Sequence, residues 1–219
     1  MINSKIASPI QIGTEIVIDT VLKSSAYKFA AWNQEIASNR KIAEKVPEEK
    51  IVRIEKQMDI GLQLAKLNKK ADNVISPFLM IDMTIFLISS IGWLYYAFTI
   101  FFHLEVLAKT YQPLFSSIIA VCLTGSSIYR IWLKCDTAQF FLNARGGALK
   151  ELKKDLVEMH PDLDSRLQWK AEVVEERLSN QDAFAPGGFF TLDRSTFLPT
   201  IASAFTYFII IIQFKLSEN

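Results

Sequence analysis

The sequence contains little cysteine and little histidine, and this scarcity excludes several kinds of site. Its 219 residues include only two cysteines, Cys122 and Cys135. On one helix their thirteen-residue separation is about 20 Å, which is too far for a disulfide between them. The two histidines, His103 and His160, stand alone in the sequence, so no Cys/His cluster has the spacing of a metal site.

The motifs of phosphate binding, glycosylation and secretion are also missing. The chain has no glycine-rich phosphate loop and no Asn-x-Ser/Thr glycosylation site. Within residues 1–25, Glu15 and Asp19 interrupt the apolar core that a signal peptide needs. The net charge is only +1, so nothing favours binding to nucleic acid through a basic surface. Because no nucleophile–base pair, metal ligand set or cofactor motif is visible, we expect neither an enzyme nor a cofactor.

Long apolar runs are what the sequence has instead. Half of the residues are hydrophobic and the mean hydropathy is +0.20, although 21% of residues are charged, so the charges are segregated. Residues 78–102, 113–133 and 195–214 are each long enough to cross a bilayer core of about 30 Å as a helix. The sequence therefore predicts an all-α membrane protein, a helical bundle with three transmembrane helices and long cytosolic helical extensions.

The segments between the runs are polar or amphipathic. Pro47 and the acids behind it are typical of a helix start, and apolar residues follow at helical spacing. Packing on neighbouring cytosolic helices explains this helix more simply than membrane-surface or calmodulin-target binding does. We therefore expect an N-terminal helical segment at 1–46, a cytosolic amphipathic helix at 47–77, a short extracellular connector at 103–112, a cytosolic helical anchor region at 134–194 and an extracellular tail at 215–219.

Lysine and arginine are unequally distributed between these segments. Nine lie between residues 40 and 70 and nine between 134 and 194, whereas the connector has only Lys109. The positive-inside rule therefore puts both basic regions in the cytosol, with the connector and the carboxyl terminus outside. Within the first run, we expect Asp82 to reach lipid head groups or a nearby lysine rather than to form an ion site.

The approach to the last run contains aromatic residues and two candidate helix caps. Phe184, Phe189 and Phe190 are too apolar for a free loop, so we expect them to dock at the membrane face or on the cytosolic helices. Asp193 or Ser195 is expected to cap the helix that follows.

Uncharged polar side chains lie on one stripe of the last run. Thr200, Ser203, Thr206 and Gln213 recur with Ile210 at steps of three and four. An unpartnered hydroxyl or carboxamide in hydrocarbon costs on the order of several kcal/mol, so the stripe should face other helices or water. Two interpretations follow, a contact between packed helices or the wall of a pore.

Two motifs near the end of the chain resemble those of a known family. Residues 206–214 read Thr-Tyr, five hydrophobic residues and Gln-Phe, which resembles the carboxyl-terminal signature of the insect gustatory receptors. Residues 187–193, Gly-Gly-Phe-Phe-Thr-Leu-Asp, resemble the stretch that precedes the last span in that family. The family, related to the insect odorant receptors, has seven spans. The three runs match the fifth to seventh, and residues 1–46 contain a possible remnant of the end of a fourth.

The resemblance implies a gustatory receptor subunit in the plasma membrane that acts as a ligand-gated, non-selective cation channel for a taste compound. It implies a homo- or hetero-tetramer whose pore is lined by the last helix of each subunit. The implied gate lies near the outer end, and bulky groups on one face can close a pore by dewetting. The candidate pore and gate residues are Tyr207, Ile210, Gln213 and Phe214, and the pore stripe adds Thr200, Ser203 and Thr206.

The taste compound itself is expected to bind among the outer parts of the helices. Trp93, Tyr96 and Ser126 are candidate ligand contacts by their depth and polarity, although the two aromatic residues also suit an interfacial belt. The alternative function is a truncated, non-conducting membrane interaction or regulatory subunit of such receptors.

Overall fold

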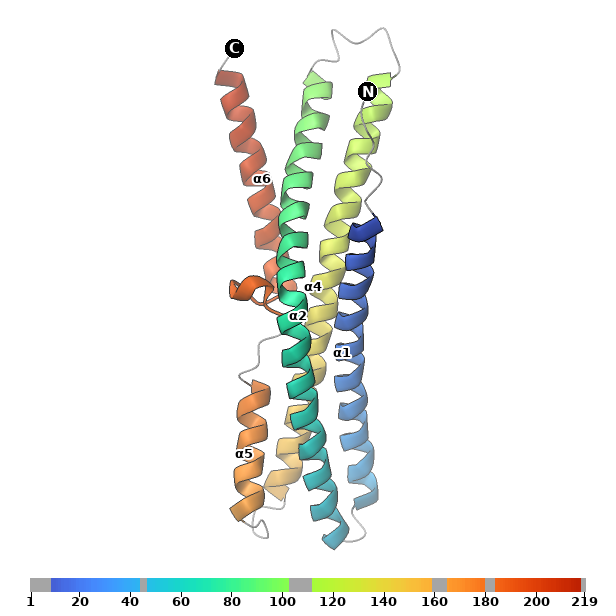
Figure 1. Cartoon of the computed structure of the whole chain (residues 1–219), viewed down its shortest axis with the longest axis vertical. Coiled ribbons are helices and arrows are strands. Elements are labelled where there is room, and N and C mark those ends of the chain that lie inside the picture. The colour runs from blue at the N-terminus through green and yellow to red at the C-terminus, as the bar shows by residue number, and fades with distance from the viewer. Residues whose placement is uncertain (1–8, 44–46, 103–111, 159–164, 180–183, 218–219) are drawn as a thin grey trace. The chain divides into compact units, whose positions relative to one another are not determined.

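The computed structural model is helical throughout most of the part of the chain that it describes, residues 9–43, 47–102, 112–158, 165–179 and 184–217. The elements are α1 (Pro9–Ala43), α2 (Pro47–Phe102), α4 (Gln112–Glu158), α5 (Ser165–Ser179), the 3₁₀ turn η2 (Pro186–Gly188) and α6 (Arg194–Ser217) (Figure 1). The predicted all-α fold is therefore confirmed.

Three of the described helices, α2, α4 and α6, are long and apolar enough to cross a membrane. They contain the three apolar runs, as predicted. The structure adds that two of them are longer than a bilayer requires. The amphipathic segment and the first run form one continuous helix through Pro77, and α4 continues from the second run to Glu158. A proline inside a helix removes one hydrogen bond and its ring crowds the carbonyl four residues earlier, yet α2 continues through Pro77.

The chain divides into two compact units. Unit 1 comprises Met1–Phe78 and Thr137–Leu192, and unit 2 comprises Leu79–Asp136 and Asp193–Asn219. The helices α2 and α4 each contribute one part to unit 1 and one part to unit 2.

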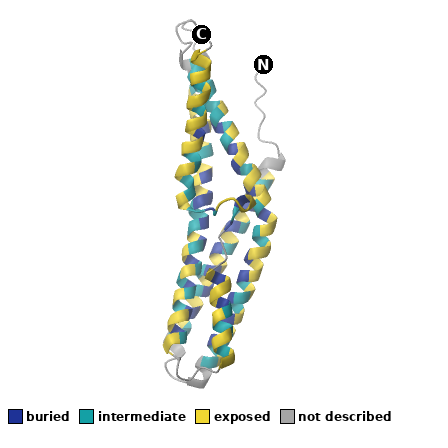
Figure 2. Cartoon of the chain, turned by 90° about the vertical axis from the view of Figure 1, so that its left-hand side faces the viewer, coloured by how far each residue is buried: buried dark blue, intermediate teal, exposed yellow. Residues whose placement is uncertain are grey.

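Unit 1 is a helical bundle with an apolar core, and its buried positions lie on the faces that the helices turn toward one another (Figure 2). Along α1 the buried side chains recur at steps of three and four, as one face of a helix requires. The Phe29 ring of α1 meets Phe141 of α4 edge to face, with centroids 5.1 Å apart. Phe141 also contacts Phe184, with centroids 5.6 Å apart. Burial of each such side chain stabilises the fold by about 1.5–3 kcal/mol. The buried side chains of α1 are Ile18, Leu22, Ala26, Phe29, Trp32 and Ile36.

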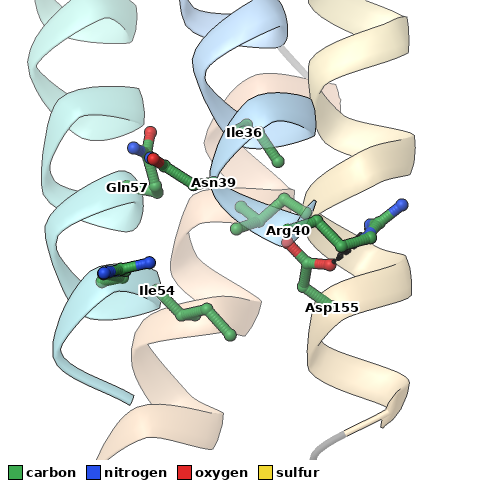
Figure 3. Close-up of a pocket in the computed structure, with 8 residues that line it drawn as sticks. Ile36, Asn39, Arg40, Ile54, Gln57 and Asp155 are labelled. Atoms are coloured by element: carbon green, nitrogen blue, oxygen red, sulfur yellow. Dashed lines mark hydrogen bonds and ion pairs between the residues drawn. The ribbon is translucent and has the colours of Figure 1, made fainter. Parts of the chain in front are cut away.

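Ion pairs join the helices of unit 1 around this core. Arg40 of α1 contacts Glu151 and Asp155 of α4, each at 2.5 Å. Burial alone would lower the pKa of Arg40, but the hydrogen bonds and charges of Asp155 and Glu151 outweigh it and raise the pKa. Arg40 and Asp155 border a cavity of about 20 Å³, with Gln57 on its wall (Figure 3). A cavity of this size has room for one water molecule.

Candidate pore helix and its attachment

The Gly-Gly pair at the start of the motif 187–193 forms a turn that few other residues would tolerate. Gly187 and Gly188 have φ angles of 60° and 74°, in the left-handed region where a Cβ is unfavourable. Ser76 of α2 accepts a hydrogen bond from the Gly187 N–H at 2.9 Å and donates one to the carbonyl of Ala185. Asp72, one turn earlier in α2, accepts from the Ala185 N–H at 3.1 Å. The motif is therefore a turn that two polar side chains of α2 hold in place.

The aromatic residues around this turn have different surroundings. Phe184 is fully buried in unit 1, and its carbonyl accepts a hydrogen bond from the N–H of the equally buried Leu192 at 2.8 Å. The expected docking on neighbouring helices is therefore observed for Phe184. Phe189 is 76% exposed and Phe190 is 38% exposed, so both rings leave apolar surface uncovered by the described residues.

Asp193, the last residue of the motif, caps α6. Its Oδ1 accepts from the Thr196 N–H at 2.9 Å and from the Ser195 hydroxyl at 2.6 Å. The Thr196 hydroxyl in return accepts from the Asp193 N–H at 3.2 Å. This reciprocal pair satisfies N–H groups that the first turn of a helix leaves free. Of the two caps that the sequence offered, Asp193 is the one used.

Two ion pairs join the three long helices of unit 2 where α6 begins. Lys134 of α4 contacts Asp82 of α2, and the Arg194 Nε of α6 donates to the Asp136 Oδ1 of α4 at 2.8 Å. Lys134 is only 4% exposed. Asp82 therefore reaches a lysine, which is one of the two predicted outcomes. The sequence did not identify Lys134 or the Arg194–Asp136 pair, because their partners lie 52 and 58 residues away.

One face of α6 contacts the rest of unit 2. Ala204 is 3% exposed, and Phe208, one turn later, meets Phe98 of α2 edge to face with centroids 6.1 Å apart. Exposed positions predominate elsewhere on α6 (Figure 2). At about 100° per residue, Gln213 lies about 180° around the helix from Ala204. The carboxamide therefore lies on the face that unit 2 leaves uncovered.

The other predicted pore residues are also exposed or half-buried. Tyr207, Ile210 and Phe214 are 58%, 38% and 67% exposed. Around the helix axis, these three residues lie on one broad side of α6 together with Ser203, Thr206 and Gln213. Ala204 lies outside that side. The pore and gate candidates therefore lie together on one surface of α6.

The hydroxyls of the stripe are satisfied within α6 itself. Thr200, Ser203 and Thr206 each donate to the carbonyl four residues earlier, at 2.7, 2.8 and 2.9 Å. Such bonds are common for hydroxyl side chains in membrane helices, and they remove the need for a neighbouring partner. Gln213 is exposed, and within the described residues it has no hydrogen-bond partner. Gln213, and not the hydroxyls, is therefore the residue that needs water or another chain as a hydrogen-bond partner.

Comparison with known families identifies the group of proteins to which the chain belongs. Residues 29–218 match the 7tm chemosensory receptor family. The chain belongs to this family. No curated protein sequence matches the chain significantly. The receptor's motifs at 187–193 and 206–214 lie within the matched residues, so the resemblance predicted from them is confirmed, and the protein is a membrane chemoreceptor.

The candidate ligand contacts of this chemosensory receptor lie on two helices of unit 2. Trp93 and Tyr96 of α2 contact each other edge to face, with centroids 6.2 Å apart. Ser126 of α4 is exposed, and its hydroxyl donates to the carbonyl of Leu123 at 2.8 Å. The two aromatic residues therefore contact each other, and ligand binding by Trp93, Tyr96 and Ser126 stays a prediction.

Proposed function

We propose that this chemoreceptor is a subunit of a ligand-gated, non-selective cation channel for a taste compound in the plasma membrane. Four copies of α6, from identical or related subunits, surround the pore. The lysine- and arginine-rich segments within residues 40–70 and 134–194, and with them unit 1, lie in the cytosol. The carboxyl terminus lies outside the cell. The family membership, the three apolar helices and the uncovered polar face of α6 support this function.

The position of Gln213 carries the proposal. Its carboxamide lies opposite the face on which Ala204 packs, and it is exposed without a hydrogen-bond partner in the described residues. In hydrocarbon such a group costs on the order of several kcal/mol. A watery axis shared with other subunits removes that cost and offers an uncharged dipole to a passing cation.

The bulky neighbours of Gln213 supply the gate in this proposal. Tyr207, Ile210 and Phe214 recur at steps of three and four, so they lie on one side of α6. Four copies of such side chains around an axis exclude water when the helices approach, which closes a pore by dewetting. A ligand bound near Trp93, Tyr96 and Ser126 opens the gate only if it binds the open arrangement more tightly.

Cysteine accessibility tests the pore directly. The receptor is expressed with both native cysteines replaced by alanine, and currents are recorded under a panel of sugars, bitter compounds and amino acids. We expect a cationic methanethiosulfonate reagent to alter the current of Gln213→Cys. The matched control is Ala204→Cys, which carries the same new thiol on the packed face of the same helix and should not respond. An unaltered current in Gln213→Cys would remove this residue from the pore.

Current recordings with and without a coexpressed relative distinguish the alternative function. A receptor that gives no current alone, but changes the current of a coexpressed full-length relative, is a non-conducting interaction or regulatory subunit. Native electrophoresis separates the two cases further, because a self-sufficient channel should form homotetramers without the relative.

A further inference from the structure

Unit 1 has a basic groove between α2 and α5, with a volume of about 960 Å³. Lys66, Lys69 and Lys70 of α2 and Arg177 of α5 line it and are exposed. Trp169 adds an exposed aromatic surface to the same groove. We define the basic groove by these four cationic residues and Trp169.

The four cations of the basic groove have no ion pair within the described residues, unlike Lys153 and Lys170 of the same unit. Lys170, on the same helix as Arg177, contacts Glu55 and Asp59 at 3.2 and 2.8 Å. These carboxylates outweigh the burial of Lys170 and raise its pKa. Lys153 of α4 likewise pairs with Glu175 at 2.5 Å. The side chains of the four groove cations are therefore available to an external anion.

Carboxylates do not cancel the charge of the groove. Asp72 and Glu176 are the acidic residues that line it, against four cations. Asp72 also accepts the hydrogen bond from the Ala185 N–H at 3.1 Å, so one of its oxygens faces that turn. The groove therefore keeps an excess of two positive charges. An anion that carries several phosphates fits it, because Arg177 offers a fork of donors and the lysines offer point charges.

The location of the groove indicates where such an anion comes from. Ala185 lines the groove, and its carbonyl accepts a hydrogen bond from Ser76, which lies two residues before the apolar run at 78–102. Lys70 is eight residues from the start of that run, which is about 12 Å along α2. Basic side chains just cytosolic of a membrane span are typical of sites for anionic lipids.

We propose that the basic groove binds the headgroup of a polyphosphoinositide from the cytosolic leaflet. The inference rests on the proposed cytosolic placement of unit 1, but it does not require that the receptor conducts. Binding is therefore measured directly, without current, so that its failure is distinguishable from failure of the channel function.

The test measures the fluorescence anisotropy of short-chain labelled phosphatidylinositol bisphosphate during titration with the full receptor in detergent. The groove variant carries Lys66→Gln, Lys69→Gln, Lys70→Gln and Arg177→Gln. The matched control removes the same charge from exposed lysines elsewhere in unit 1, by the changes Lys23→Gln, Lys28→Gln, Lys150→Gln and Lys154→Gln.

Each basic residue near a membrane surface contributes about fivefold to binding of an anionic lipid. We therefore expect the groove variant to bind at least about tenfold more weakly than the native receptor, and the control variant to change by less than about twofold. Circular dichroism checks that both variants stay helical. If the quadruple variant does not fold, Arg177→Gln alone replaces it, because a change at this exposed side chain should not disturb folding. This single change should still weaken binding several-fold.

Three results overturn the proposal. An equal loss in the groove and control variants shows general attraction to the charge of the unit. Equal binding of labelled phosphatidylserine shows that clustered phosphates are not recognised. Soluble inositol trisphosphate that binds as tightly as the lipid shows that the ligand is a free anion and not a membrane headgroup.

Discussion

A close helix contact in unit 1 makes a sharp prediction about Gly61. A Cβ at this position of α2 would lie 2.8 Å from both Cζ2 and Cη2 of Trp32, and 3.6 Å from Cγ1 of Val174. Carbon atoms in contact are normally about 3.5–4.0 Å apart. Trp32 is only 2% exposed, so its ring has little space into which it can move. The change Gly61→Ala therefore overpacks the contact between α1, α2 and α5.

Two opposing effects determine the magnitude. Overpacking of a core typically costs about 1–3 kcal/mol, whereas alanine is about 0.8–1.0 kcal/mol better than glycine inside a helix. Gly146 of α4 isolates the second effect, because a Cβ there would meet nothing within 4 Å. The difference between Gly61→Ala and Gly146→Ala is therefore the overpacking cost alone. For a chain of this length it corresponds to about 2–12 °C in the midpoint of thermal unfolding.

The assay is thermal unfolding of the purified receptor in detergent, followed by far-ultraviolet circular dichroism. Gly61→Ala should melt below Gly146→Ala by that margin. Trp32→Phe removes the two ring atoms that clash, and it also removes a buried indole N–H that has no partner. The double variant of Trp32→Phe and Gly61→Ala should therefore be more stable than the sum of the two single changes predicts. A Gly61→Ala receptor that melts at or above Gly146→Ala would refute the close approach.

Two further predictions concern the attachment of the long helices in unit 2. Asp82→Asn leaves the buried Lys134 without its partner, so we expect a loss of about 3–5 kcal/mol. It should appear as a reduced yield of monodisperse receptor in size-exclusion chromatography, and an unchanged yield contradicts the ion pair. Asp193→Ala removes the cap of α6 and should lower stability by about 1 kcal/mol, measured in the same melting assay. Asp193→Asn retains an acceptor and should lose less, so equal losses in the two variants contradict a capping role.

Several features of this receptor were determined by the sequence itself, because each depends on residues close together in the chain. Apolar runs of sufficient length predict spans from transfer free energy and helical rise alone. Asp193 follows the glycine turn and precedes an apolar run, which is a local signal for a cap. The two motifs near the end of the chain were likewise sufficient to indicate the family that residues 29–218 match.

The tertiary structure decided which distant residues meet. The Asp82–Lys134 pair and the contacts of Asp72 and Ser76 with the glycine turn join positions 52 to 113 residues apart. No local pattern encodes such a pairing. The same holds for the basic groove. In the sequence the lysines of α2 indicate only a solvated helix face, and the fold places Arg177 of α5 beside them.

The last helix shows both contributions at once. Its sequence placed the hydroxyls and Gln213 on one stripe, since helical periodicity is a property of the chain alone. Only the packing of Ala204 and Phe208 showed which face unit 2 covers, and only the side-chain geometry showed that the hydroxyls bond to their own helix. Burial and hydrogen bonding depend on which neighbours surround a side chain, and the folded arrangement of helices sets those neighbours.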